Sequence, residues 1–416
     1  MWTLKSAMLI DAGVILLLLG LVFHNHQAIV LALTLLSFVI IVGYKTVNVR
    51  LDAQRTVSTD KSFEGGIVDV RLRIKNLGRK IEFLEIMDDL PPTMEIVGGS
   101  NYLLITLNRG EEFVMKYRFK CHLRGHYSLG PVRLRSRPLF GMFYTEETID
   151  VLSPVTVLPR IEDLSGIVIK AKYPKIFPGA LTTRQVGPGT EFYSIREYVR
   201  GDELKKVNWK AYARTGRIMV NEYDRENVSD VMIVLDSRET EGVGTVLENP
   251  LAHGARAAAT LANYFLQRRD SVGVAVYTDT LRIVPIDAGG GRLYRLLDEI
   301  AAAEPRGNAP LNGVVDLLLP YVSPNATVIL ISTLNNDLTV KEALRKVCAH
   351  HFDLIILSPS QVDFERNALG LKADDLYRTL KLERSILLSE IRSYGARVID
   401  WTPETSLRRA LTGLMA

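Results

Sequence analysis

The stretch GPGTEFYSIREYVRGDELKKVNWKAYARTGRIMVNEYD, residues 187–224, is the most distinctive part of the chain. Of the 43 residues from 184 to 226, 16 are charged, nine basic and seven acidic, against 24% in the whole chain. The charges alternate with large aromatic side chains, namely Phe192, Tyr193, Tyr198, Trp209, Tyr212 and Tyr223. A disordered tail is typically of one sign or of low complexity. The stretch therefore predicts a folded, half-buried surface whose charges pair with one another.

Length and composition indicate the number of domains and limit the partners that the chain can have. A chain of 416 residues predicts two or three domains. The net charge of +4 is spread along the chain, so we expect no nucleic-acid partner. Cys121 and Cys348 form neither a disulfide framework nor a metal-ligand spacing. We predict a membrane hairpin over 1–49, a β-domain over 50–160, a linker with the distinctive stretch over 161–227, and an α/β domain over 228–416.

The chain is 47% hydrophobic, and much of this apolar content lies in the first 44 residues. Two apolar runs of 17 residues, 7–23 and 28–44, are separated by four polar residues, and each is about long enough to span a bilayer. Lys5 precedes the first run, and four basic residues follow the second, at Lys45, Arg50, Arg55 and Lys61. The segment between the runs contains no Lys or Arg. The positive-inside rule then predicts a multi-pass cell-membrane protein with both termini and the soluble domains in the cytoplasm. A cleaved signal peptide is the weaker alternative, because the second run follows at once.

From about residue 50 to 160 the apolar residues alternate with polar ones. Residues 68–75 read Val-Asp-Val-Arg-Leu-Arg-Ile-Lys, and residues 113–121 and 132–137 alternate in the same way. One apolar and one polar face per strand is typical of an antiparallel sheet with one solvated side. We predict an immunoglobulin-like β-sandwich. Its polar faces are rich in Arg and Lys, which fits either a solvated face or contact with the anionic inner leaflet.

The last part of the chain alternates buried strands with helices. Residues 231–235, Val-Met-Ile-Val-Leu, form a continuous apolar run that predicts a buried parallel strand. Further strands are expected at 271–277, 281–286, 327–332, 354–357 and 397–399, with helices at 251–269, 289–303, 311–321, 339–349 and 375–394. This alternation predicts a doubly wound α/β sheet.

Nine residues of the distinctive stretch resemble the signature of the domain of unknown function 58 family. They are Glu191, Arg196, Tyr198, Gly201, Asp202, Trp209, Lys210, Arg214 and Arg217. The resemblance extends beyond the signature to nearly the whole chain. It implies a membrane-anchored protein with a von Willebrand factor A-like, Rossmann-like domain. Members of this family often occur alongside MoxR-type AAA+ ATPases, and the family has no established activity.

The likeness to von Willebrand factor A domains can be tested on metal ligands. Such domains often hold a divalent cation in a loop that reads Asp-x-Ser-x-Ser after the first strand. Here the loop contains Asp236, Ser237, Arg238 and Thr240. A cation at the second ligand position would repel a metal. We therefore expect no metal and no cofactor, and a degenerate site in which Arg238 pairs with Asp236.

The signature itself admits three interpretations. In one, Asp202 caps a helix that runs from Glu203, residues 217–224 form a strand beside the strand that ends at Asp236, and the signature charges form a lattice of ion pairs. In another, part of the cluster is a recognition surface for a peptide or a partner ATPase. Catalysis by Glu191 or Asp202 is a third reading, which the abundant basic residues disfavour because they keep both carboxylates ionised.

These observations predict a membrane-anchored, non-enzymatic scaffold or adaptor. We expect it to interact with a MoxR-type AAA+ ATPase through the von Willebrand factor A-like region, with no catalytic residues. A hydrolase that uses the charged signature cluster is the alternative. An adhesion receptor outside the cell conflicts with the charge bias and with the altered metal loop.

Overall fold

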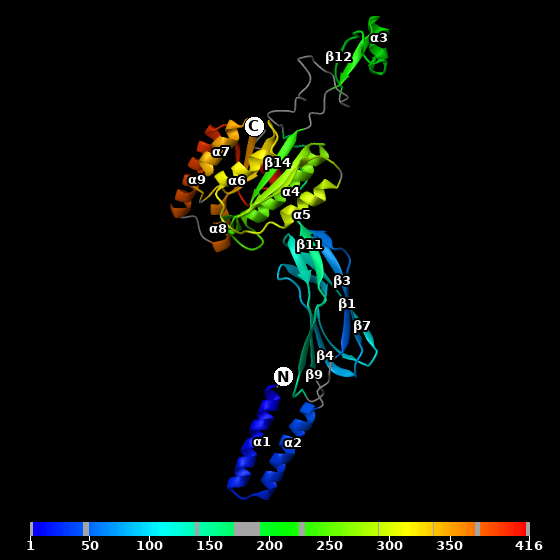
Figure 1. Cartoon of the computed structure of the whole chain (residues 1–416), viewed down its shortest axis with the longest axis vertical. Coiled ribbons are helices and arrows are strands. Elements are labelled where there is room, and N and C mark those ends of the chain that lie inside the picture. The colour runs from blue at the N-terminus through cyan, green and yellow to red at the C-terminus, as the bar shows by residue number, and fades with distance from the viewer. Residues whose placement is uncertain are drawn as a thin grey trace. The chain divides into compact units, whose positions relative to one another are not determined.

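The computed structural model divides the chain into two compact units, Met1–Arg160 and Ile161–Ala416. It describes residues 3–44, 50–137, 141–169, 192–223, 229–289, 291–335, 337–370 and 375–412. The first unit holds apolar N-terminal helices and several β-sheets, and the second holds an α/β sheet (Figure 1). The protein is therefore multidomain.

Two apolar helices, α1 (Leu4–Val22) and α2 (His26–Tyr44), pack against each other at the start of the first unit. The buried residues of α1 are small and recur every seven positions, at Ser6, Gly13 and Gly20. A Cβ atom at Gly13 would lie 2.9 Å from a methyl group of Leu36. Small residues thus let the two helices approach closely, as at interfaces between membrane helices.

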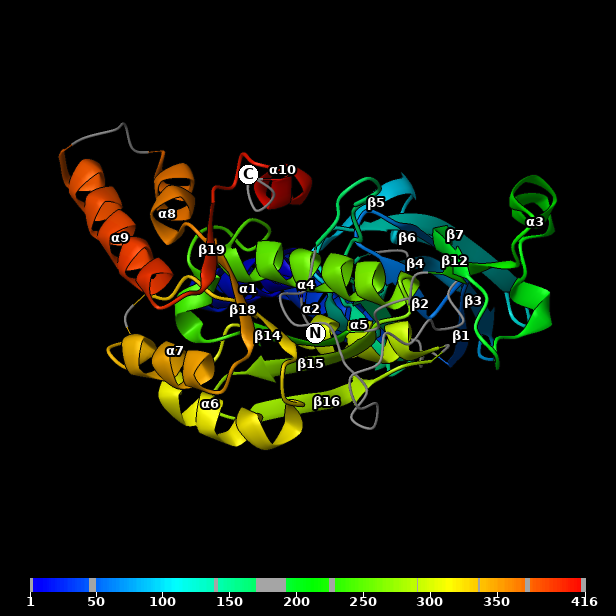
Figure 2. The ribbon, with the colours of Figure 1, turned by 90° about the horizontal axis from the view of Figure 1, so that it is seen from above.

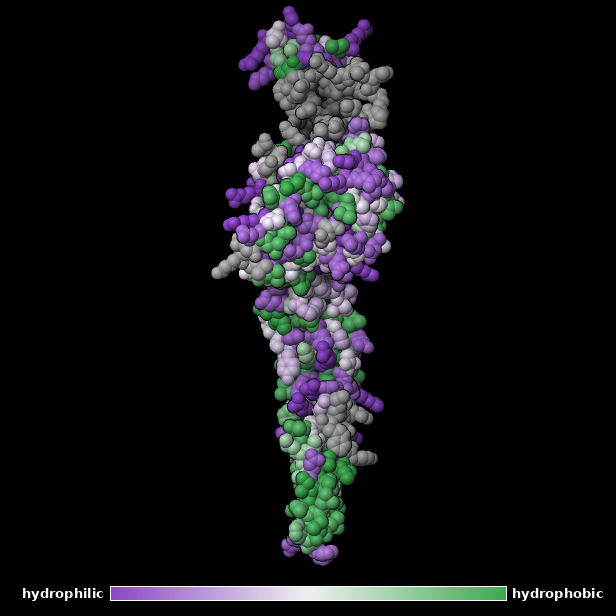
Figure 3. All heavy atoms as spheres, turned by 90° about the vertical axis from the view of Figure 1, so that its left-hand side faces the viewer, coloured by the Kyte–Doolittle hydropathy of each residue, from purple (hydrophilic) through white to green (hydrophobic). Residues whose placement is uncertain are grey.

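The outer surfaces of α1 and α2 are apolar, as Figure 3 shows. Among the described residues, Leu4–Val22 is the one helix that is long and apolar enough to cross a bilayer, with a mean hydropathy of 2.0. The apolar part of α2, His26–Val42, is shorter. Asn25 accepts hydrogen bonds from the first backbone amides of α2 and so defines where that helix begins.

The rest of the first unit consists of eleven described strands in three sheets. Their bounds are β1 Leu51–Val57, β2 Lys61–Phe63, β3 Ile67–Asn76, β4 Ile81–Asp88, β5 Met94–Gly99, β6 Tyr102–Leu107, β7 Glu112–Cys121, β8 Gly125–Leu129, β9 Val132–Arg137, β10 Thr145–Ile149 and β11 Ser153–Leu158. The sheet orders are β1-β3-β7-β5, β10-β9-β4-β6 and β2-β11-β8. The two four-stranded sheets are antiparallel and share one hydrophobic core, so they form a sandwich.

A buried ion pair crosses the interior of this sandwich. Arg55 on β1 binds the carboxylate of Asp88 on β4, and neither side chain is exposed. Asp88 also accepts a hydrogen bond of 2.7 Å from the hydroxyl of Tyr117 on β7. Burial, followed by the charge of Asp88, raises the pKa of Tyr117 above its usual value. The contacts join three strands from the two facing sheets, so a polar network ties the sandwich together.

The α/β sheet of the second unit has six strands in the order β16-β15-β14-β17-β18-β19. All neighbours are parallel except β15 and β16. The elements are β14 Asp230–Asp236, α4 Pro250–Gln267, β15 Ser271–Tyr277, β16 Leu281–Asp287, α5 Arg292–Ala301, α6 Leu311–Leu318, β17 Thr327–Ile331, α7 Val340–Ala349, β18 Asp353–Pro359, α8 Gln361–Leu369, α9 Asp375–Ser393, β19 Arg397–Trp401 and α10 Leu407–Thr412. In Figure 2, α4 lies on one face of the sheet and α6 and α7 lie on the other.

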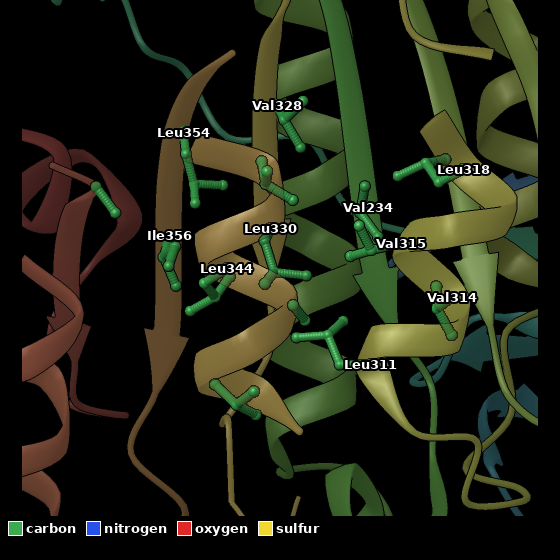
Figure 4. Packing of buried hydrophobic residues seen from close by; sticks show 14 of the residues in the cluster. Val234, Leu311, Val314, Val315, Leu318, Val328, Leu330, Leu344, Leu354 and Ile356 are labelled. Atoms are coloured by element: carbon green, nitrogen blue, oxygen red, sulfur yellow. The ribbon is translucent and has the colours of Figure 1, made fainter. Parts of the chain in front are cut away.

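Alternate side chains of the central strands point to opposite faces of the sheet. Val234, Leu330 and Ile356 enter the core beneath α6 and α7, where they meet Val315 and Leu344 (Figure 4). On the opposite face α4 comes so close that a Cβ at position 254 would lie 3.0 Å from a methyl group of Ile331, so a larger residue there would require its neighbours to shift. Both faces are buried, which explains the continuous apolar runs in these strands.

Two helices of this unit, α8 and α10, were not predicted from the sequence. The predicted strand at 217–224 is present as β13 (Met219–Tyr223), but it pairs with β12 (Phe192–Glu197) and not with the strand that ends at Asp236. Both edges of β14 already pair with β15 and β17. No free edge of β14 remains for β13, so the predicted pairing was wrong.

Candidate functional site

The carboxyl edge of the α/β sheet carries the first candidate site. β14 and β17 are neighbours, and the chain continues from them toward opposite sides of the sheet. Asp236 is the last residue of β14, and Ser332 and Thr333 directly follow β17. Open α/β sheets bind ligands at such a switch point, beyond the carboxyl ends of the strands. The predicted loop residues therefore lie where this fold places function.

A buried arginine fills this position. The side chain of Arg238 is 1% exposed and lies between two carboxylates. Its Nη2 is 2.8 Å from Oδ2 of Asp236, its Nε is 3.1 Å from Oδ1 of the same residue, and its Nη1 is 2.8 Å from Oδ2 of Asp337. The predicted pairing of Arg238 with Asp236 is thus present. Asp337 is an additional partner that the sequence analysis did not identify.

Both carboxylates are held in place by further donors. Asp236 accepts a hydrogen bond of 2.7 Å from the hydroxyl of Ser332. Asp337 accepts bonds from the backbone amides of Leu311 and Thr339 and from the Thr339 hydroxyl, at 2.6–2.9 Å. Buried charges persist only when they are paired and hydrogen-bonded. The arrangement meets that condition for the guanidinium and for both acids.

The electrostatics favour a permanent cation here. Burial opposes the charged form of Arg238, but Tyr277 and the carboxylates of Asp236 and Asp337 together raise its pKa above the usual value. Burial also acts to raise the pKa of Asp337. The hydrogen bonds from Thr339 and Leu311 and the charge of Arg238 outweigh it and lower that pKa. Arg238 and Asp337 therefore stabilise each other's charged forms.

Glu241 is a further acid of this site that sequence reasoning missed. Its side chain is buried, and its Oε1 accepts bonds of 2.9 and 2.6 Å from the amide and the hydroxyl of Thr333. Burial, followed by the charge of nearby Asp236, raises the pKa of Glu241 well above its usual value, despite the opposing bonds from Thr333. The neutral acid is therefore favoured. We call Asp236, Arg238, Glu241, Ser332 and Asp337 the Arg238 cluster.

The Arg238 cluster does not fit a divalent cation. The guanidinium lies between the two carboxylates that would serve as ligands. Ser237 turns away and donates its hydroxyl to the carbonyl of Glu304 at 2.6 Å, and the buried Thr240 hydroxyl has no hydrogen-bond partner among the described residues. Within those same residues, no group of three or more His, Cys, Asp and Glu side chains could hold a metal.

A second buried arginine closes the neighbouring part of this edge. Arg384 on α9 is 4% exposed and donates to the carbonyl groups of Thr333 and Ser358 and to the carboxylate of Asp400, at 2.9–3.1 Å. These acceptors lie at the ends of β17 and β18 and in β19. Two buried guanidinium groups thus lie at this edge, beside a cavity that Asp337 and Arg384 help to line.

The second candidate site is the signature module, which we define as residues 192–223. It contains the β12–β13 pair, the short 3-10 helix η1 (Leu204–Lys206) and α3 (Trp209–Thr215). Arg196 and Asp202 form a bidentate ion pair at 2.7 and 2.8 Å, and Asp202 also accepts the amide of Val199. The bonds from Arg196 and then Val199 lower the pKa of Asp202 to about 2. Gly201, with φ +117°, forms the turn between them.

The module differs from the prediction in its helix. Asp202 does not cap a helix that starts at Glu203, because only a single 3-10 turn follows. Val207 instead forms a β-bridge to Val220, and Asn208 caps α3 by accepting the amide of Ala211 at 2.9 Å. The bridge requires extended backbone at Val207, so the helix begins later than predicted.

The predicted lattice of signature charges is only partly present. Arg196 pairs with Asp202, and Arg217 pairs with Glu197 at 2.8 Å. Lys210 and Arg214 have no ion pair among the described residues, and Tyr198 is half-buried with its amide bonded to the Ile218 carbonyl. Trp209 is 64% exposed. Glu191 lies outside the described residues.

Comparison with known proteins places both candidate sites in one family segment. Residues 194–364 match the family described as "Protein of unknown function DUF58". This segment belongs to the DUF58 family. The DUF58 segment contains nearly all of the signature module and the whole Arg238 cluster, and it ends before α9.

Individual relatives are distant. The chain is 21% identical over 276 residues to "Uncharacterized protein YeaD" of Bacillus subtilis (strain 168), covering 65% of this chain and 67% of that protein. Native alpha-2-macroglobulin from Escherichia coli matches 28% of this chain and 18% of its own, with 15% identity and a TM-score of 0.24. A CARDB domain from Pyrococcus furiosus matches 26% of this chain and 89% of its own, with 13% identity and a TM-score of 0.18.

Proposed function

We propose that this DUF58 protein is a membrane-anchored, non-enzymatic adaptor that engages a MoxR-type AAA+ ATPase through its second unit. The observation that carries the proposal is the Arg238 cluster. An internal guanidinium takes the place of a bound cation, so this edge of the sheet keeps its structure without a metal. Such an edge suits a protein that binds other proteins and does no chemistry.

The membrane part of the proposal rests on α1 and α2. We propose that both helices cross the cell membrane as a hairpin and leave the soluble parts in the cytoplasm. The length and hydropathy of Leu4–Val22 support the first span. The heptad seam of small residues supports a paired second span. The basic residues on the two sides of the pair support the orientation.

The assignment of the two soluble parts to known fold types is also part of this proposal. The sandwich of two antiparallel sheets with one shared core supports an immunoglobulin-like domain. The six-stranded order, with β14 and β17 at the switch point and β16 as an antiparallel edge, supports a von Willebrand factor A-like domain. In this interpretation, Asp236 and Arg238 occupy the altered metal loop.

The hydrolase alternative is less well supported. A general base works best when its pKa lies near the working pH. The pKa of Asp202 is lowered to about 2 by its bonds with Arg196 and Val199, so it is a weak base. Glu241 has a raised pKa, but its side chain is buried and already bonded to Thr333. Neither acid is placed to act on a substrate.

Affinity purification of the full-length protein from its native membranes tests the proposal. The complex is isolated in mild detergent and analysed by mass spectrometry, with an unrelated membrane protein carrying the same tag as the control. We expect an AAA+ ATPase of the MoxR type to be enriched with the wild type. Repeated isolation without any AAA+ ATPase would contradict the adaptor function.

A further inference from the structure

Within residues 195–221, where burial is described, polar contacts and not a hydrophobic core hold the signature module together. Among its residues whose burial is described, only Val207 and Val220 are buried. Its fold depends on the β12–β13 ladder, the Arg196–Asp202 ion pair, and the bonds of Asn208 to Ala211 and Asn221. A segment of this size normally needs an apolar core or a covering partner to be stable. The module therefore exposes apolar surface that a partner could cover.

That apolar surface is concentrated in large side chains that point outward. Val199, Leu204, Trp209 and Tyr212 are 63%, 70%, 64% and 42% exposed. The rings of Trp209 and Tyr212 meet edge to face with their centroids 6.2 Å apart, and the two residues lie one helical turn from each other on α3. Exposed tryptophan and tyrosine side chains are the types most enriched among the energetic centres of protein interfaces.

Two cations lie across the surface of α3 from these rings. At about 100° per residue, Lys210 and Arg214 lie about 60° and 100° to one side of Ala213, and Trp209 and Tyr212 lie about 40° and 100° to the other side. Both cations are exposed, and neither has an ion pair among the described residues. Residues 195–221 carry seven basic and three acidic side chains. We define the α3 face as Trp209, Lys210, Tyr212, Ala213 and Arg214, all of which are exposed.

We propose that the α3 face binds a protein segment that combines acidic and apolar side chains. The apolar side chains would cover the rings of Trp209 and Tyr212, and the carboxylates would pair with Lys210 and Arg214. Charge decides against a second copy of this chain, because two such faces would repel each other. This inference rests on the proposed adaptor function and names the surface that the ATPase contacts.

Fluorescence of the full chain in detergent tests the inference. Of the three tryptophans, Trp2 lies outside the described residues and is replaced by phenylalanine for this assay, and Trp401 is 3% exposed. Trp209 is 64% exposed, so binding at the α3 face shifts its emission to shorter wavelength. The probe is a synthetic peptide that alternates glutamate with leucine and phenylalanine. We expect saturable binding that weakens with salt. The peptide with glutamine in place of glutamate and a thymidine oligonucleotide should bind far more weakly.

Two charge reversals provide the matched comparison. Lys210→Glu removes a cation of the α3 face and should weaken peptide binding by about fivefold, the size of an exposed ion-pair effect. Lys205→Glu makes the same charge change on η1, where Lys205 is 82% exposed and pairs with Glu203, and should leave binding within about twofold. Both positions are exposed, so both variants should fold.

Several results would overturn the inference. They are no emission shift with the acidic peptide, an equal shift with the glutamine peptide or the oligonucleotide, equal weakening by the two reversals, or a Trp209 already shielded from iodide quenching in the free chain. Capture of the ATPase separates this inference from the proposed function. If wild type and Lys210→Glu retain the ATPase equally, the adaptor function stands and the surface is wrong. If the peptide binds but no ATPase is captured, the α3 face stands as a binding surface and the adaptor function is wrong.

Discussion

Arg238→Ser is the most informative single substitution, because it removes the internal cation and leaves its two carboxylates. Asp236 and Asp337 are 0% and 4% exposed in their ion pairs with Arg238. Removing one partner of a buried ion pair costs about 3–5 kcal/mol. Since 1 kcal/mol shifts the midpoint of a domain of this size by about 2–4 °C, we expect Tm to fall by roughly 6–20 °C. The assay is thermal unfolding of the full chain in detergent, followed by the fluorescence of buried Trp401.

The same variant tests whether Arg238 stands in a cation's place. The vacated space faces two carboxylates and the new serine hydroxyl, which are suitable ligands for Mg²⁺ or Mn²⁺. A metal at 100 times its Kd would restore about 2.7 kcal/mol. Arg295→Ser, an exposed substitution on α5, is the matched control and should change stability by less than about 0.5 kcal/mol. An unchanged Tm for Arg238→Ser would refute the buried cluster, and a loss that no metal restores would refute the cation replacement.

Three further substitutions test the surrounding structure. Because the raised pKa of Glu241 lets the folded state keep a proton that the unfolded state releases, Glu241 lowers stability by about 1.4 kcal/mol per pH unit between its ordinary pKa of 4.5 and its raised pKa in the folded state. Glu241→Gln should therefore gain stability over wild type as pH rises from 5 to 8 in denaturant titrations, and a pH-independent difference would contradict this. Leu330→Ala should cost about 2–5 kcal/mol in the same titrations, because Leu330 is 4% exposed in the core beneath α7. Asn208→Ala removes the cap of α3 and should weaken its protection from hydrogen exchange by about 1 kcal/mol; unchanged protection at Tyr212 would show that the cap is dispensable.

The sheet of the second unit was predictable because its signals are local. Continuous apolar runs such as 231–235 define buried strands, and the mismatch of Arg238 with the expected metal loop indicated its pairing with Asp236. Glu241 was missed because it follows the loop directly but is no part of the Asp-x-Ser-x-Ser pattern, and Asp337 was missed because no motif spacing relates it to that loop. The ends of β14 and β17 bring them together in space, and a single sequence gives no register between those strands.

The signature was harder to predict because two periodicities compete in it. Leu204, Val207 and Ala211 follow a helical spacing, but Val207 is bridged to Val220 and Leu204 is 70% exposed. Asn208 was the better signal for the start of the helix, since asparagine is a favoured N-cap residue. The charge count predicted ion pairs in general. It could not tell that Arg196 would be paired and that Arg214 would have no ion-pair partner in the described part of the chain.

The central claim is that Arg238 makes the carboxyl edge of the sheet independent of metal. Isothermal titration of the full-length wild type in detergent with Mn²⁺, repeated with Mg²⁺, tests it most directly. The account predicts no saturable heat of binding and no change in Tm with either ion. Micromolar binding that disappears in Asp236→Asn would contradict it, because a metal would then occupy the position that the structure gives to the guanidinium group.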